Sequence, residues 1–329
     1  RGQVQEAHQL GEQLFRLAQG QVDPVPRMLA HFMLGQAAFY LGKPAMAQTH
    51  HAQVLALYPV QEAQALAVRY GLDLGVGAHS WQAWALWQLG TPTQALRHSQ
   101  AARTLAHEGS HAMSLAFALI WATVVHQFRR DVSAVHELAM AAITLATAQG
   151  FTQRVAHATV LHGWALARQG QGDVGRAAIR QGLAASLATG SMLLQPYGLG
   201  LLAETYETGG PPEEGLAVLA EAQAVMAVTG VQWYAAELSR LQGALLLQQA
   251  VPDAAQAEAC LQQALALARQ QQTKSWELRA AMSLSRLWQQ QGKHAEARAL
   301  LAPIYGWFTE GFDTADLQEA KVLLDELGG

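Results

Sequence analysis

The sequence predicts an all-α fold: a right-handed superhelical solenoid of helical hairpins with a period of about 40 residues. The first observation is the composition: 51% of the residues are hydrophobic, 14% are charged, and Ala, Leu and Gln are prominent, which favours packed helices. The second is a glycine or polar residue that ends an apolar run once in every period. The third is apolar spacing of three and four between these stops, as in Leu161, Trp164 and Ala165, which is typical of amphipathic helices.

The stops are accompanied by small residues at fixed offsets. The stops are Gly2, Gly42, Gly90, Arg130, Gly170, Gly210, Ala250 and Gly292. Seven residues before each stop after the first stand Gly35, Ala83, Thr123, Gly163, Ala203, Gly243 and Ser285. Five residues after the stops stand Ala7, Ala47, Ala95, Val135, Gly175, Gly215, Ala255 and Ala297. This pattern resembles tetratricopeptide repeats, in which two helices cross where a larger side chain would separate them.

The elements follow in order from these markers, and residues 1–329 are predicted to form a single repeat array. Residues 3–19 are expected to be the second helix of a truncated repeat, and residues from about 27 to 307 to form helical hairpins. The longer interval between Gly42 and Gly90 predicts a longer connection or an extra helical turn near Tyr58-Pro59 and Tyr70-Gly71. Residues 313–327 are expected to be a C-terminal capping helix.

Charge and composition argue against several functional classes. The net charge is −4, and no block of Lys or Arg offers the basic stripe of a nucleic-acid surface. No apolar run is long enough for a membrane helix, and no signal peptide is visible in the first residues, which read as already helical and suggest a start inside a longer chain. The one cysteine, Cys260, allows no intramolecular disulfide and fits a cytoplasmic location.

Candidate catalytic and metal-binding motifs are weak. His107 and His111 match the spacing of the zinc-protease motif H-E-x-x-H, but Gly109 falls between them at a predicted helix end. The pairs His50 with His51 and His157 with His162 lack the spacing of a metal site on one helix. Phosphate-binding loops and nucleophile elbows are absent. The sequence therefore predicts a protein that is not an enzyme, with no cofactor and no metal.

The inner surface of the array is the remaining candidate site. In tetratricopeptide arrays the first helix of each hairpin lines the concave groove, and its register here selects aromatic residues first and charged residues later. The predicted groove residues are Phe39, Tyr40, Trp84, Trp87, Phe128, Trp164, Tyr197, Glu204, Glu207, Glu237, Arg240, Arg279 and Arg286. Trp84→Ala or Trp164→Ala should then weaken binding and leave helicity intact. The alternative is that these rings are buried between hairpins and that Glu237 simply pairs with Arg279.

Three C-terminal segments carry a more specific resemblance: residues 236–247, 257–293 and 300–327. They resemble the C-terminal repeat region of bacterial multidomain regulators, in which a class III adenylate or guanylate cyclase domain or another effector precedes a signal-transduction ATPase. The related maltotriose-responsive activators bind inducer in a repeat superhelix. The resemblance implies a regulatory region attached to ATPase or cyclase domains, whose own motifs this sequence lacks.

Two functions remain open at this point. The first is a non-catalytic module that binds a protein or peptide and regulates a larger bacterial signalling protein. The alternative is a sensor that holds a small-molecule inducer in the concave groove. An open channel would favour the peptide, whereas an enclosed pocket would favour the small ligand.

Overall fold

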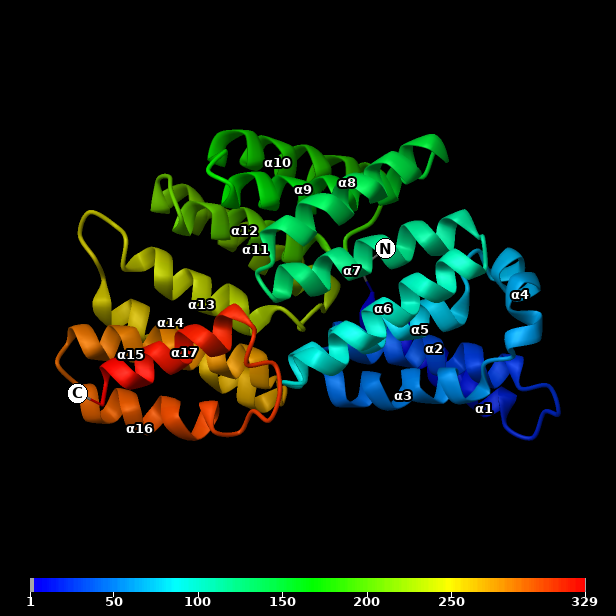
Figure 1. The fold of residues 1–329 in the computed structure, drawn as a ribbon, viewed down its shortest axis with the longest axis horizontal. Helices are drawn as coiled ribbons and strands as arrows, with labels where there is room; N and C mark the ends of the chain where they lie inside the picture. The colour runs from blue at the N-terminus through cyan, green and yellow to red at the C-terminus, as the bar shows by residue number, and fades with distance from the viewer. Residues whose placement is uncertain (1–2, 329) are drawn as a thin grey trace.

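The computed structural model describes residues 3–328, and within that range all regular structure is helical, as predicted. Seven hairpins pair α2 with α3, α5 with α6, and so on to α15 with α16 (Figure 1). The helices are α1 (Val4–Ala18), α2 (Val25–Tyr40), α3 (Pro44–Leu57), α4 (Ala63–Tyr70), α5 (Leu74–Gln88), α6 (Pro92–Glu108), α7 (Ala112–Phe128), α8 (Val132–Ala148) and α9 (Thr152–Arg168). They continue with α10 (Gly172–Ala188), α11 (Gln195–Glu207), α12 (Pro212–Thr229), α13 (Ala235–Leu246), α14 (Ala254–Gln270), α15 (Lys274–Gln290), α16 (His294–Tyr305) and α17 (Ala315–Glu326).

Most predicted stops are left-handed turns between the two helices of a hairpin. Gly42, Gly90, Gly170 and Gly292 have φ of 73°, 87°, 88° and 78°, values that glycine adopts without steric cost. The second helix then begins with a residue suited to a helix start, such as Pro92 at the beginning of α6. The predicted stop at Gly2 lies outside the described residues.

The predicted stop at Ala250 is wrong in detail. Helix α13 already ends at Leu246, and α14 begins at Ala254 after Asp253, whose carboxylate accepts a hydrogen bond from the backbone N–H of Gln256. The connection is therefore longer here, and the register of α14 shifts by two residues. Ala255 is exposed, whereas Ala257 is the buried small residue that faces α13.

Close helix crossings occur where the sequence predicts small residues. A Cβ atom added to Gly163 would lie 2.7 Å from the carbonyl oxygen of Gly175 and 2.8 Å from the amide nitrogen of Ile179. Both obstacles are backbone atoms of α10, so they can move only if the whole helix moves. Ala83, Ala203 and Ser285 are likewise buried at the equivalent positions.

We predict that Gly163→Leu destabilises the array by about 1–3 kcal/mol or more, because the side chain must separate α9 from α10. Chemical denaturation followed by circular dichroism measures the loss. Gly209→Ala is the control, since a Cβ atom there meets nothing within 4 Å and the backbone has no left-handed φ. Equal stability of the Gly163→Leu variant and the original chain would contradict the close crossing of α9 and α10 at this position.

The long interval between Gly42 and Gly90 forms a separate small element rather than an extended hairpin. After α3 the chain makes a 3₁₀ turn, η1 (Val60–Glu62), and then α4, which ends at Gly71 with φ of 73°. Pro59 and Gly71 therefore bound an inserted two-turn helix, which lies at the outer edge of the array beside α5 (Figure 1).

The superhelix closes on itself, so that its last hairpins contact its first (Figure 1). Three successive first helices end at carbonyl oxygens that accept hydrogen bonds from the C-terminal third of the chain. The backbone N–H of Gln232 donates to Tyr40 over 2.7 Å, the Ser275 hydroxyl to Trp87 over 2.5 Å, and Arg279 to Phe128 over 2.6 Å. Terminal carbonyls of a helix have no partner within it, so the donors to Tyr40 and Phe128 satisfy acceptors that would otherwise be unpaired, whereas the Trp87 oxygen also accepts a hydrogen bond from the backbone N–H of Gly90 over 3.0 Å.

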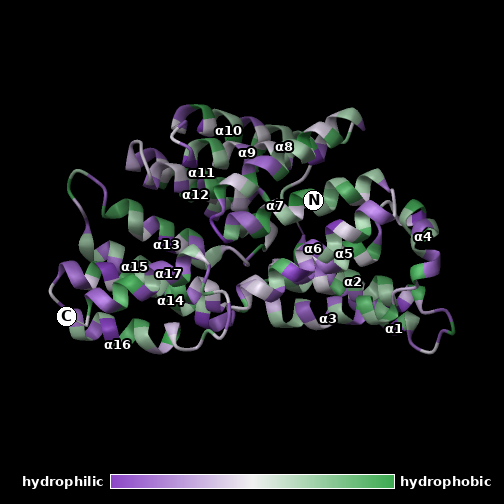
Figure 2. Cartoon of the chain, viewed as in Figure 1, coloured by the Kyte–Doolittle hydropathy of each residue, from purple (hydrophilic) through white to green (hydrophobic). Residues whose placement is uncertain are grey.

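Each helix carries both apolar and polar residues (Figure 2), and the apolar ones form one large core with smaller clusters beside it. The large core extends from Val4 to Trp276, because closure of the superhelix joins the first helices to α13 and α15. In the described part of the chain, no helix combines the length and the hydropathy that a membrane crossing requires.

Candidate functional site

The predicted aromatic groove residues form a closed core in the middle of the superhelix. Phe39, Trp84, Phe128 and Trp164 are fully buried, and Trp87 and Tyr197 are at most 3% exposed. Tyr40 is also buried. The prediction that these rings line an open groove is therefore not met in this structure. They face inward together, but the space between them is filled by rings from the C-terminal repeats.

The rings that fill this space come from Trp233, Tyr234 and Trp276. The Trp233 ring lies 5.1 Å from Phe39 and 5.8 Å from Trp84, measured between ring centroids. The Trp276 ring lies 4.6 Å from Trp87 in an edge-to-face arrangement. Such contacts stabilise beyond simple burial of area. The aromatic surface of the early repeats is thus complementary to the start of α13 and α15.

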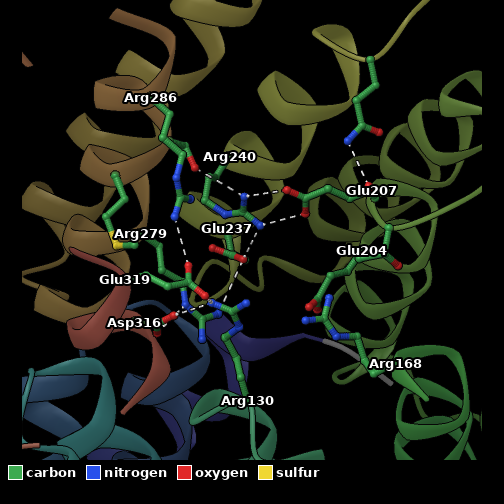
Figure 3. Close-up of a pocket in the computed structure, with 14 residues that line it drawn as sticks. Arg130, Arg168, Glu204, Glu207, Glu237, Arg240, Arg279, Arg286, Asp316 and Glu319 are labelled. Carbon is green, nitrogen blue, oxygen red and sulfur yellow. Dashed lines mark hydrogen bonds and ion pairs between the residues drawn. The ribbon is translucent and has the colours of Figure 1, made fainter. Parts of the chain in front are cut away.

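The charged groove residues lie together in a pocket of about 400 Å³ beside this aromatic core (Figure 3). All six charged residues of the predicted groove line it. The lining residues are Arg130, Arg168, Glu204, Glu207, Thr208, Glu237, Gln248, Arg240, Arg279, Met282, Ser283, Arg286, Asp316 and Glu319. They come from the ends or inner faces of α7, α9, α11, α13, α15 and α17 and the turns that follow them.

Ion pairs tie most of these groups together. Arg240 binds both carboxylate oxygens of Glu207 over 3.3 Å and one oxygen of Glu237 over 2.9 Å. Arg279 binds Asp316 over 2.8 Å, and its guanidinium lies 5.1 Å from the ring centroids of both Trp87 and Trp276. The pairing predicted for Glu237 and Arg279 is present but loose, at 3.7 Å.

Three groups in the pocket are left with unused bonding capacity. Arg168 has no hydrogen bond or ion pair among the described residues, although its guanidinium lies 6.0 Å from the ring of Trp164. Glu204 accepts one hydrogen bond, from the indole N–H of Trp164 over 3.0 Å. Glu237 is 2% exposed, and its Oε2 has no partner. Figure 3 shows Arg168 beside Glu204, across the pocket from Glu237.

Burial and neighbouring charges shape the ionisation of the pocket. Burial raises the pKa of Glu204, an effect that the Arg168 and Arg279 charges oppose. Burial would also raise the pKa of Glu207, but the charge and hydrogen bonds of Arg240 outweigh it and lower that pKa. Burial lowers the pKa of Arg279, whereas Asp316 and Glu237 raise it by more, so this guanidinium stays charged.

Among the charged residues of the pocket, the sequence register missed four: Arg130, Arg168, Asp316 and Glu319. Arg130 stands at a hairpin stop where most other repeats have glycine, and its φ is 61°. A left-handed arginine is strained, and strained residues cluster at functional sites. Its guanidinium binds Glu319 over 2.7 Å and Asp316 over 3.5 Å. The non-glycine stop was therefore a usable signal in the sequence.

Asp316 and Glu319 belong to α17, which was predicted only as a cap. This helix also carries part of the pocket wall, and Asp313 just before it binds Arg129 over 2.6 Å. The register derived from the hairpins could not identify these residues, because α17 is not part of a hairpin.

The histidines of the candidate motifs lie on different elements or face other histidines. His107 lies in the last turn of α6 and His111 precedes α7, so the two do not share a helix. Instead, His31 faces His50 and His79 faces His98, with Nδ1 atoms 2.9 Å apart and ring centroids 5.2 and 5.0 Å apart. In each pair the two imidazole rings share one hydrogen bond between their Nδ1 atoms. The described residues include no group of three or more potential metal ligands.

Comparisons with known proteins identify the fold. No family model and no curated protein sequence matches the chain. Among solved structures, a Rap protein in complex with competence and sporulation factor aligns with a TM-score of 0.62 and 11% identity, over 99% of this chain and 93% of that one. The Rap conjugation gene regulator of plasmid pLS20 with the Phr* peptide aligns with a TM-score of 0.62 and 12% identity, over 94% and 78%. A chain of the APC/C hetero-tetramer Cut9-Hcn1 aligns with a TM-score of 0.56 and 11% identity, over 99% and 53%. The chain shares with them an all-helical repeat solenoid.

Proposed function

We propose that this chain is a regulatory module that binds a short peptide, or a protein segment of that kind, in the charged pocket inside its superhelix. The observation that carries the proposal is the set of unused groups at Arg168, Glu204 and Glu237 in a pocket of about 400 Å³. A buried carboxylate oxygen without a partner is costly, and a ligand that supplies a donor removes that cost. Two proteins of similar fold are described in complex with a peptide or a factor, which supports this class of partner.

The resemblance of the C-terminal segments suggests the kind of larger protein to which the module belongs. We propose that it controls an ATPase or cyclase domain attached to the same chain or associated with it. Closure of the superhelix offers a route for this control: Arg130 and Arg279 line the pocket and also join α7 to α15 and α17. A ligand that exchanges partners with these arginines changes the stability of the closed form.

A small-molecule inducer is the second candidate. The aromatic part of the predicted groove is filled, so an extended channel along the array is not available in this form. The remaining volume lies within the range of small-ligand sites.

The binding test uses the full chain as a target for a displayed library of random peptides. Synthetic copies of enriched peptides are then titrated calorimetrically. We predict that Arg168→Met weakens binding at least about tenfold, since it removes the unpaired cation but keeps an apolar stem against Trp164. Arg97→Met on the exposed face of α6 is the matched control. The proposal fails if neither displayed peptides nor free short peptides bind, or if the peptides that bind the original chain bind the Arg168→Met variant equally well.

A further inference from the structure

The charges of the pocket are balanced, and this balance restricts the ligand. Five arginines face five carboxylates around one space. A ligand with only negative charge would approach five carboxylates, and one with only positive charge would approach five guanidinium groups. Either arrangement places like charges together in a partly desolvated site, where repulsion is poorly screened.

The unused groups are of both signs, and they lie on different helices. Glu204 of α11 and Glu237 of α13 offer acceptors, because Glu204 has only the Trp164 indole as a partner and Glu237 Oε2 has none. Arg168, in the last turn of α9, offers all its donors. Acceptors and donors therefore remain free at the same time, with Arg168 and Glu204 side by side in the pocket (Figure 3).

The other charged groups hold this arrangement in place. Arg240 is fixed by Glu207 and Glu237, and Arg279 is fixed by Asp316 and by the carbonyl oxygen of Phe128. These ion pairs occupy Glu237 Oε1, while its Oε2 is buried without a hydrogen-bond partner. The mouth of the pocket is formed by Arg286 and Glu319, whose side chains are 46% and 38% exposed and admit a ligand from solvent.

We infer that the pocket selects a small zwitterion, a ligand whose ammonium group binds the carboxylate of Glu204 and whose carboxylate binds the neighbouring guanidinium of Arg168. An α-amino acid and a peptide of a few residues with free ends share this chemistry. The inference rests on the proposed function for the location of the site, and it adds the charge pattern of the ligand. A neutral ligand leaves the Glu204 carboxylate and the Arg168 guanidinium without charged partners, so it binds more weakly.

The test uses a tripeptide pool with random side chains in four forms: free ends, N-acetylated, C-amidated, and blocked at both ends. The four forms are incubated with the full chain, and mass spectrometry measures how much of each is retained. A mixture of the twenty free amino acids is tested separately in the same way. We expect free ends to be retained at least about tenfold more than any blocked form. If the chain retains free amino acids instead of tripeptides, the zwitterionic ligand is an amino acid.

Charge-removing variants assign each end of the ligand to its residue. Arg168→Met should abolish the difference between free and amidated C-termini, and Glu204→Gln should abolish the difference between free and acetylated N-termini. Arg97→Met and Glu221→Gln, both at exposed positions outside the pocket, should change neither comparison. Circular dichroism confirms that each variant is folded.

Outcomes that overturn the inference are distinct from those that overturn the proposed function. Equal retention of blocked and free forms, or no retention of free tripeptides or amino acids, shows that the pocket does not select zwitterions. Displayed peptides that bind and are weakened by Arg168→Met would in that case preserve the proposed function. Selective retention of free amino acids without any peptide binding would preserve the zwitterion site and overturn the peptide function.

Discussion

Replacing Trp84 by alanine is expected to destabilise the whole closed superhelix, by about 3–5 kcal/mol. The ring is fully buried and contacts Trp81, Trp121 and Trp233 at centroid distances of 5.3, 5.1 and 5.8 Å. Its indole N–H also donates to the carbonyl oxygen of Trp121 over 2.9 Å. The substitution leaves a cavity between early and late repeats and removes a buried hydrogen bond.

Urea denaturation followed by circular dichroism measures this effect. Trp307→Ala is the control of the same chemistry, because Trp307 is 45% exposed and its loss leaves no enclosed cavity. We expect the control to change stability much less. A Trp84→Ala variant that keeps its stability and loses only ligand binding would contradict the closed core and restore the open aromatic groove.

The sequence predicts the hairpins because their signals are local. Glycine after an apolar run, and small residues such as Gly163 at fixed offsets from it, report helix ends and crossings within one repeat. The inward direction of Trp84 and Trp87 follows from the same register. What covers these rings could not be predicted, because Trp233 and Trp276 lie several repeats away and reach them only through curvature that accumulates along the array.

The charged part of the site was predicted better than the aromatic part for the same reason. Glu204 and Arg240 lie on neighbouring first helices, so a register within each hairpin is enough to bring them to one surface. Arg168 is near a helix end and Asp316 belongs to α17, and neither position is defined by the crossing residues. Their place in the pocket depends on how the superhelix closes.

Acidification is expected to unfold the protein well above the pH at which carboxylates alone would do so. The pKa of His51 and that of His157 are lowered to about 3, mainly by burial and in smaller part by the charges of His50 and Arg154 respectively. His51 has no hydrogen-bond partner at either ring nitrogen and stacks on Trp81, while His157 reaches only Ser186, over 3.3 Å. The Gly35 backbone raises the pKa of His51 by less than burial lowers it, so burial decides the direction of the shift at both sites.

The two half-buried histidine pairs, His31 with His50 and His79 with His98, also make the folded state less stable as the pH falls. Burial lowers the pKa of His50 and of His79 to about 4, and the facing rings of His31 and His98 add to the effect. A shared hydrogen bond between two imidazoles is lost when both are protonated, because both then only donate. These groups contribute less than the fully buried ones, since solvent screens their charges.

The direction of the pH dependence follows from proton uptake. An imidazole in the unfolded chain titrates near 6.5, so between pH 6.5 and 3 the unfolded state binds more protons than the folded state, and the free energy of unfolding falls as the pH falls. Each of the two buried imidazoles accounts for about 3 kcal/mol between pH 7 and pH 4. Urea titrations at several pH values measure the slope. His51→Phe, which keeps a ring against Trp81, should reduce it, whereas His294→Phe at an exposed position should not. A free energy of unfolding that is constant from pH 7 to pH 4 would show that these imidazoles accept protons in the folded state.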